Sequence, residues 1–363
     1  MKRQRLRDLG YRIGDLPTGP LNAITDIAGV RVGMTTLITD EPYVLRTGVT
    51  VIAPQEGEVW RRNLFAAVDV LNGNGEITGR SWIDEFGLLM GPIALCSTFS
   101  VGAVQEGMVA AEAEADVDAD FKLPVVSETY DGWLSMSETF AVRPHHARAA
   151  LDAARGGPVP EGNVGGGTGT NAHEFKAGTG TASRMIEIGG EHFMLGALVQ
   201  ANYGRREDLR LDGVPVGRLL PVSRIPGLFE DAGRKDGSIV VILATDAPLL
   251  PHQLKRLARR AALGLGRTGG FGYPTSGDIF LAFSTGNDLG RASGKGLDVA
   301  MSGLRALREM SLAPLLKAAV EATEEAIWNS LTMAETMVGR RGRTSHALPL
   351  DLLLEVAPPP GRA

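Results

Sequence analysis

The chain has 363 residues, of which 44% are hydrophobic and 22% are charged. This balance excludes a disordered chain and a membrane-spanning protein, and a formal net charge of −5 without a dense basic patch excludes a nucleic-acid partner. The length predicts two domains of about 150 residues or one large α/β unit.

Short apolar runs alternate with segments of helical periodicity along the chain. In chain order, β-branched runs predict buried strands at residues 49–53, 93–97, 194–201, 239–244 and 279–283. Apolar residues at three- and four-residue spacing predict helices at 61–71, 101–115, 144–154 and 252–263. They also predict a nearly continuous helical region at 297–338, with a break or a second helix start at Pro314. This mixture predicts an α/β or α+β fold.

Residues 209–237 break both periodicities with prolines, glycines and charges, which predicts a long exposed loop. Loops of more than about 12–15 residues inside a compact domain are uncommon and are often functional. This one leads directly into Ser238, at the start of a strongly apolar strand.

The single cysteine, Cys96, excludes an intramolecular disulfide and any multi-thiolate metal site, and its apolar neighbours predict a buried thiol. Adjacent His145 and His146 lack the spacing of metal ligands, so no metal or other cofactor is expected. The basic N-terminus is followed by Gly, Asp and Pro where a signal peptide would be apolar, which predicts a cytoplasmic protein.

The chain has 47 glycines, about 13% of the sequence against an average of about 7%. The run at 165–170 resembles a phosphate loop, but Asn171 and Ala172 stand where Lys and Ser or Thr should follow. The run at 264–269 has the spacing of a dinucleotide fingerprint, but it follows a predicted helix. We therefore favour glycine turns that let another segment approach closely, and keep nucleotide binding as an alternative of another class.

Ser238 is the remaining candidate for chemistry. Gly-Ser before a strand is ordinarily a turn. If the bond between Gly237 and Ser238 is cleaved, however, Ser238 gains an α-amine with a pKa near 7.7–8.0, which can take the proton of its own hydroxyl.

Several sequence blocks resemble the DmpA-like peptidases, a family of self-processing L-aminopeptidase/D-esterases and β-peptidyl aminopeptidases. In family order, the blocks are residues 72–79, 126–132, 161–169, 174–184, 200–204, 236–238, 244–251 and 276–279. The resemblance implies one αββα sandwich over residues 1–363, shared with ornithine acetyltransferase and convergent with N-terminal-nucleophile (Ntn) hydrolases. It also implies cleavage into an α-chain of residues 1–237 and a β-chain of residues 238–363, and homotetramers of the processed unit.

The resemblance assigns a role to each candidate site residue. Ser238 is the nucleophile and its amine the base, while Asn202 donates to the oxyanion with Tyr130 as a second stabilising contact. Ser276 and Asp278, which share one face if their strand extends back to them, contact the nucleophile and the substrate amine.

Two segments depart from the family pattern. Phe99 stands where the family usually has a His, and residues 329–337 replace a run of small residues and threonines. Both departures concern the choice of substrate more than the reaction.

We therefore expect a serine aminopeptidase or amidase that acts on small amides, esters or short peptides with a free amino terminus. Hydrolysis of a non-peptide amide oligomer and acyl transfer are alternatives on the same fold. A chain that stays uncleaved would be a folded scaffold without a nucleophile.

Overall fold

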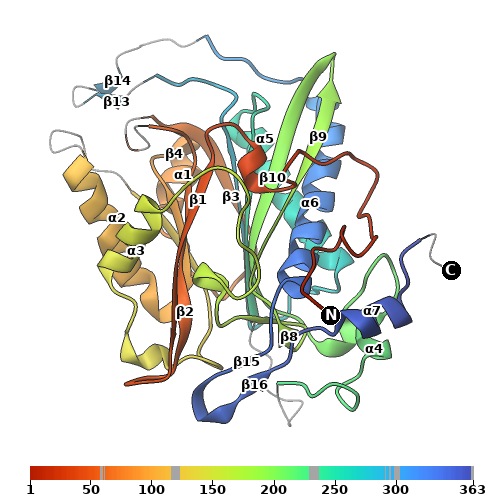
Figure 1. Cartoon of the computed structure of the whole chain (residues 1–363). Helices are drawn as coiled ribbons and strands as arrows, with labels where there is room; N and C mark the ends of the chain where they lie inside the picture. The colour runs from red at the N-terminus through yellow and green to blue at the C-terminus, as the bar shows by residue number, and fades with distance from the viewer. Residues whose placement is uncertain are drawn as a thin grey trace.

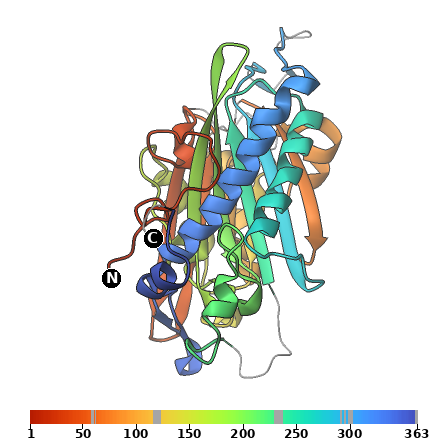
Figure 2. The ribbon, with the colours of Figure 1, turned by 90° about the vertical axis from the view of Figure 1, so that its right-hand side faces the viewer.

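The computed structural model describes residues 1–57, 60, 62–115, 123–228, 237–290, 292–293, 296–297 and 303–360. Two β-sheets pack face to face, and a pair of helices covers each outer face (Figures 1 and 2). The helices are α2 (Val101–Ala115) and α3 (Pro144–Asp152) on one side, and α5 (Pro251–Arg267) and α6 (Ala313–Thr332) on the other. This is the predicted four-layer αββα sandwich.

The first sheet has four strands, in the order β1 (Arg31–Thr39), β2 (Leu45–Ala53), β5 (Ile93–Ser97) and β6 (Val125–Thr129). The second has six, in the order β4 (Leu88–Leu89), β3 (Leu64–Gly73), β12 (Ser276–Ser284), β11 (Gly237–Thr245), β10 (Glu191–Asn202) and β9 (Thr179–Ile188). β11 pairs antiparallel with β10 and parallel with β12, and α5 forms the crossover that a parallel pair requires.

Shorter elements complete the described chain. They are α1 (Arg80–Phe86), α4 (Val216–Leu219), α7 (Leu350–Val356) and the two-residue strands β7 (Asn171–Ala172), β8 (Phe175–Lys176), β13 (Ala292–Ser293), β14 (Gly296–Leu297), β15 (Met337–Val338) and β16 (Thr344–Ser345).

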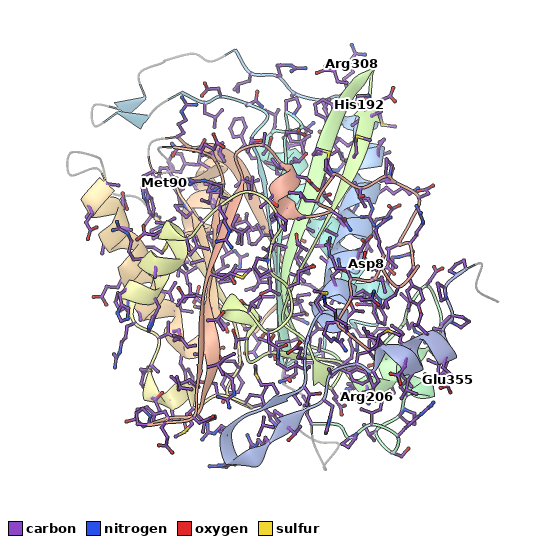
Figure 3. All side chains as sticks on the ribbon, in the orientation of Figure 1. Asp8, Met90, His192, Arg206, Arg308 and Glu355 are labelled. Carbon is purple, nitrogen blue, oxygen red and sulfur yellow. The ribbon has the colours of Figure 1, made fainter. Side chains whose placement is uncertain are left out.

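Alternation along β11 determines where the predicted nucleophile lies. Val240 and Ile242 belong to the apolar cluster between the two sheets, whereas Ile239 and Val241 pack in the cluster under α5 and α6. Because side chains alternate along a strand, Ser238 shares the face of Val240. Ser238, at the start of β11, therefore faces the gap between the two sheets. Side chains fill the space between the layers (Figure 3).

The helix predicted at 61–71 is wrong, because most of this segment forms β3. Leu64, Ala66 and Val68 face the gap between the sheets, and Ala67 packs on the helix side. A strand buried on both faces carries apolar residues at nearly every position, so it also satisfies three- and four-residue spacing.

The helical region predicted at 297–338 is only partly correct. α6 covers residues 313–332, whereas residues 303–308 are not helical and residues 298–302 lie outside the described part of the chain. Pro314 lies in the first turn of α6 and starts this helix, as the sequence allowed.

The loop predicted at 209–237 is irregular in its described part, residues 209–228, apart from the short helix α4, but it is only partly exposed. Leu209, Val216, Leu220 and Ile225 are buried in the cluster that includes α5 and α6, and α4 lies beside α7 (Figure 1). These apolar residues anchor the segment in the core. Because their spacing is irregular, the sequence shows no helical or strand periodicity that would predict their burial. Residues 229–236 lie outside the described part.

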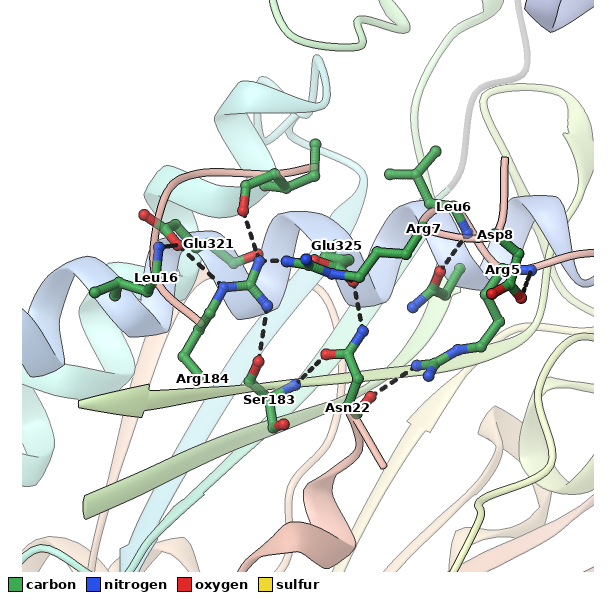
Figure 4. A network of polar contacts seen from close by, with 12 residues as sticks. Arg5, Leu6, Arg7, Asp8, Leu16, Asn22, Ser183, Arg184, Glu321 and Glu325 are labelled. Carbon is green, nitrogen blue, oxygen red and sulfur yellow. Dashed lines mark hydrogen bonds and ion pairs between the residues drawn. The ribbon is translucent and has the colours of Figure 1, made fainter. Parts of the chain in front are cut away.

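A buried ionic network fixes the N-terminal arm to α6 (Figure 4). Arg184 of β9 binds Glu321 at 3.0 Å and Glu325 at 2.7 Å. Arg7 Nε and Asn22 Nδ2 bind the other oxygen of Glu325 at 2.7 and 2.6 Å. Burial opposes ionisation of Glu325, but the charges of Arg184 and Arg7 outweigh it and hold its pKa below the usual value.

Candidate active site

Ser238 is buried at the start of β11, and its hydroxyl contacts the peptide bond that precedes it. Ser238 Oγ donates to the Gly237 carbonyl oxygen at 2.6 Å. The nucleophile therefore lies beside the carbonyl group that the predicted self-cleavage must attack.

Asn202 lies directly opposite Ser238 at the end of β10. Directly paired residues of antiparallel strands place their side chains on the same face, about 4.5–5.5 Å apart at Cβ. The Asn171 N–H donates to Asn202 Oδ1 at 3.0 Å, so the amide oxygen is occupied and the Nδ2 donor is left for a ligand. This orientation suits the predicted role in binding an oxyanion.

Asn171 lies in β7, and a strained turn joins β7 to β8. His173 and Glu174 form the turn with φ values of 49° and 59°, in the left-handed region that favours Gly and Asn. Arg206 stabilises it by donating to the His173 carbonyl at 3.1 Å and the Glu174 carbonyl at 2.8 Å. Burial lowers the pKa of His173 to about 4, so this side chain is neutral near pH 7.

Ser276 and Asp278 lie on one face of β12, as predicted, but not on the face of the Ser238 hydroxyl. The pairing register aligns Ser276 with Gly237 and Asp278 with Ile239, so both side chains point toward the α5 and α6 layer. They flank the main chain of Ser238, whose nitrogen would become the α-amine.

The Asp278 carboxylate is buried and accepts two hydrogen bonds. They come from Ser276 Oγ at 2.7 Å and Asn72 Nδ2 at 3.0 Å. Burial raises the pKa of Asp278, and the two hydrogen bonds oppose that shift.

Tyr130 follows β6 and borders the gap between the sheets. The preceding Thr129 accepts a hydrogen bond at 2.8 Å from Gln200, which lies two residues before Asn202 on the same face of β10. The structure thus brings Ser238 and Asn202 to one end of the gap, and it places the end of β6, which Tyr130 follows, near Gln200. Ser276 and Asp278 lie behind the sheet.

Glu128 is a buried carboxylate of this region that the sequence did not single out. Its oxygens accept hydrogen bonds from the Glu76 N–H at 3.0 Å and from Thr98 Oγ1. Burial raises its pKa, although these hydrogen bonds lower it. Within the described residues, no ion pair joins Glu128 to a cationic side chain.

Two glycines separate Glu128 from Ser238. A Cβ atom on Gly75 would lie 3.2 Å from Glu128 Oε1 and 3.4 Å from the Cα of Gly277, the direct strand partner of Ser238. The block at 126–132 contains Glu128 and Tyr130 at the two-residue spacing of one strand face, which is the signal that could have found it.

The glycine run at 165–170 packs against other backbone segments, as predicted. A Cβ atom on Gly166 would lie 2.6 Å from the Leu95 carbonyl oxygen, and one on Gly169 would lie 2.0 Å from the Arg46 carbonyl oxygen. Cys96 is a buried free thiol, and burial raises its pKa well above the usual value. Among the described residues, no cluster of three or more His, Cys, Asp or Glu could hold a metal ion, and no helix is long and apolar enough to cross a membrane.

Residues 22–345 match the sequence model of peptidase family S58. The chain belongs to this family. It is 44% identical over 360 residues to the β-peptidyl aminopeptidase BapA of Sphingosinicella microcystinivorans, covering 95% of this chain and 89% of that protein.

Solved structures agree with the family assignment. A β-aminopeptidase from a Burkholderia species superposes with a TM-score of 0.91 at 48% identity, covering 98% of this S58 chain and 99% of that one. The L-aminopeptidase D-Ala-esterase/amidase of Ochrobactrum anthropi, a variant of the Ntn hydrolase fold, has a TM-score of 0.88 at 41% identity and covers 97% of each chain. The resemblance to self-processing aminopeptidases, the Ntn-hydrolase-like fold and the hydrolase class predicted from the sequence are thereby confirmed.

Proposed function

We propose that this S58 peptidase cleaves its own chain between Gly237 and Ser238 and then hydrolyses small amides, esters or short peptides with a free amino terminus. The observation that carries the proposal is the 2.6 Å contact of Ser238 Oγ with the Gly237 carbonyl, opposite the oriented amide of Asn202. The products are an α-chain of residues 1–237 and a β-chain of residues 238–363.

Both reactions use the same atoms. In self-cleavage, Ser238 Oγ attacks the Gly237 carbonyl carbon, the C–N bond breaks, and the acyl group moves from nitrogen to oxygen as an ester. This shift passes the hydroxyl proton to the nitrogen and leaves a free α-amine on Ser238. Water then hydrolyses the ester and releases the Gly237 carboxylate and the Ser238 hydroxyl. In the mature enzyme this amine takes the hydroxyl proton as Oγ attacks the substrate carbonyl, and Asn202 Nδ2 donates to the oxyanion.

The free amino terminus of the substrate needs a carboxylate, and two candidates flank Ser238. Asp278 was predicted from the sequence, but its side chain lies on the face of the sheet opposite the Ser238 hydroxyl. Glu128 is favoured because Gly75 brings its carboxylate close to Gly277, the strand partner of Ser238, and because no described ion pair neutralises it. An ammonium group at Glu128 would compensate a carboxylate that burial otherwise destabilises.

Paired variants separate these two carboxylates. Glu128→Gln and Asp278→Asn are compared by the ratio of kcat/KM for an amino-acid p-nitroanilide and its N-acetylated form. The variant of the ammonium-binding residue loses the preference for the free amine. If Asp278→Asn alone loses it, the assignment to Glu128 is wrong.

Denaturing gel electrophoresis tests the proposed function itself. The purified protein should give fragments of 237 and 126 residues, which together make up the 363-residue chain. Ser238→Ala should remain one band and should not hydrolyse p-nitroanilides. A wild-type chain that stays intact and inactive would refute the proposal, and transfer of the acyl group to an added amine instead of water would favour the acyltransferase alternative.

The family resemblance also favours a cytoplasmic homotetramer of processed units. Sedimentation of the cleaved protein tests the assembly, and a stable monomer would contradict it.

A further inference from the structure

Three exposed aromatic side chains gather beside the proposed site, and two of them, Phe99 and Phe140, have no role in the proposed hydrolytic step. Phe99, Tyr130 and Phe140 have exposed fractions of 48%, 36% and 58%. The Phe99 ring lies 6.0 Å from that of Tyr130, edge to face, and 6.2 Å from that of Phe140 in a stacked arrangement. We call these three residues the aromatic cluster.

The cluster is held together by a buried carboxylate. Asp131 Oδ1 accepts hydrogen bonds from Ser97 Oγ at 2.6 Å and Ser137 Oγ at 2.8 Å. Ser97 precedes the short helix 98–100 that carries Phe99, and Ser137 begins the short helix 137–139 that Phe140 follows. Asp131 itself follows Tyr130, so one side chain ties together the three segments that present the rings.

One residue of the cluster has a strained backbone conformation. Phe140 has a φ of 50°, a left-handed conformation that is unfavourable for a bulky side chain. Tyr130 lies over Gly132, where a Cβ atom would come within 2.3 Å of the tyrosine ring and hydroxyl. An aromatic ring that is exposed to solvent adds little to the stability of the core. The strained backbone at Phe140 therefore indicates that the rings serve to bind a ligand.

The position of the cluster identifies that ligand. Thr98, which precedes Phe99, donates to Glu128, the proposed ammonium site. On the other side, Thr129 connects Tyr130 to Gln200 on the face of Asn202 and Ser238. In the substrate, the first residue carries the free ammonium group and the carbonyl group that reacts. The side chain between these two groups is therefore the part of the substrate that would reach the cluster.

We propose that the aromatic cluster binds an aromatic or branched aliphatic side chain on the amino-terminal residue of the substrate. The inference rests on the proposed function and specifies the substrate class of that site. Edge-to-face and stacked rings offer such a side chain both apolar area and favourable ring geometry.

The experiment measures selectivity rather than activity alone. The ratio of kcat/KM for the phenylalanine and alanine p-nitroanilides is compared in the wild type, Phe99→Ala, Phe140→Ala and Phe86→Ala. Phe86 is the control, because it is equally exposed (50%) but stacks on Trp82 of α1. We expect the ratio to fall at least ten-fold in the two cluster variants and to stay within two-fold in the control.

Two further variants protect the test against misfolding. Phe140→Asn removes the ring but tolerates the left-handed conformation, so it should lose selectivity without losing thermal stability. Phe99→Leu keeps apolar area and should restore part of the ratio that Phe99→Ala loses.

Other outcomes overturn the inference. A ratio within two-fold of wild type in both cluster variants would show that the rings do not bind the substrate side chain. Dissociation of an assembled protein by Phe99→Ala or Phe140→Ala at an unchanged ratio would assign the cluster to a subunit contact. Neither result touches the proposed function, which fails only if the wild-type chain neither cleaves itself nor hydrolyses a p-nitroanilide.

Discussion

The hydrogen bond from the Asn171 N–H to Asn202 Oδ1 determines which end of the Asn202 amide meets the oxyanion. Replacing Asn171 with Pro removes this N–H, and Asn171→Ala is the matched control because it keeps the N–H. Both variants lose the bond from Ser345 Oγ to the Asn171 side chain, so any difference between them isolates the main-chain donor.

The expected magnitude follows from the energy of one neutral hydrogen bond. Without the Asn171 N–H, the amide can rotate and present its oxygen to the oxyanion, at a cost of about 0.5–1.5 kcal/mol. At about 1.4 kcal/mol per factor of ten, kcat of Asn171→Pro should fall roughly two- to twelve-fold below that of Asn171→Ala. Asn202→Asp accepts the same bond but cannot donate, and should lose about 10²–10³-fold.

The assay is p-nitroanilide hydrolysis per cleaved chain, with the cleaved fraction taken from a denaturing gel and folding checked by thermal unfolding. KM should change little, because the oxyanion forms only after the substrate is bound. Equal kcat values for Asn171→Pro and Asn171→Ala at equal stability would refute this account of how Asn202 is oriented.

Two further predictions concern stability. Arg184→Met should lower the free energy of unfolding in urea by about 3–5 kcal/mol, because it leaves Glu321 and Glu325 buried without their main cation. The surface control Arg148→Met should lower it by less than about 1 kcal/mol. Equal losses in the two variants would show that burial does not strengthen the Arg184 ion pairs. Burial lowers the pKa of Lys176 to about 7, so between pH 7 and about 10 the unfolded chain binds a proton that the folded chain lacks. The free energy of unfolding should therefore rise with pH over this range by up to about 1.4 kcal/mol per pH unit, and it should be independent of Lys176 below about pH 7. Lys176→Met should remove this slope in pH-dependent urea unfolding. A slope that persists unchanged in Lys176→Met would assign the dependence to other groups.

The sequence predicted elements best where one signal dominated. The run at 239–244 is almost wholly β-branched and apolar, and it forms the centre of β11. The helix predicted at residues 61–71 is wrong because β3 is buried on both faces, so its apolar residues fit the strand and the helix periodicity at once. The buried anchors of residues 209–228 were missed because tertiary packing, not local pattern, fixes them.

The candidate site shows the same division. The resemblance identified Ser238, Asn202 and Tyr130. The structure pairs Ser238 with Asn202, and it connects Thr129, which precedes Tyr130, to Gln200 of the same strand as Asn202. The placement of Asp278 depends on the register between β11 and β12. The sequence pattern of each strand alone does not show how the two strands align. Glu128 approaches Ser238 only because distant segments meet across glycines, which no local spacing encodes.

The two faces of β11 explain how one residue can supply both nucleophile and base. The Ser238 hydroxyl points into the gap between the sheets, where Asn202 can stabilise the charge that develops on the attacked carbonyl. Its nitrogen belongs to the strand backbone, beside the Ser276–Asp278 pair of β12, whose carboxylate lies on the opposite face. Because it lies behind the sheet, the Asp278 carboxylate can stabilise the protonated amine of Ser238 without facing the oxyanion. The sheet therefore separates the charge that would stabilise the protonated amine from the charge that develops on the attacked carbonyl.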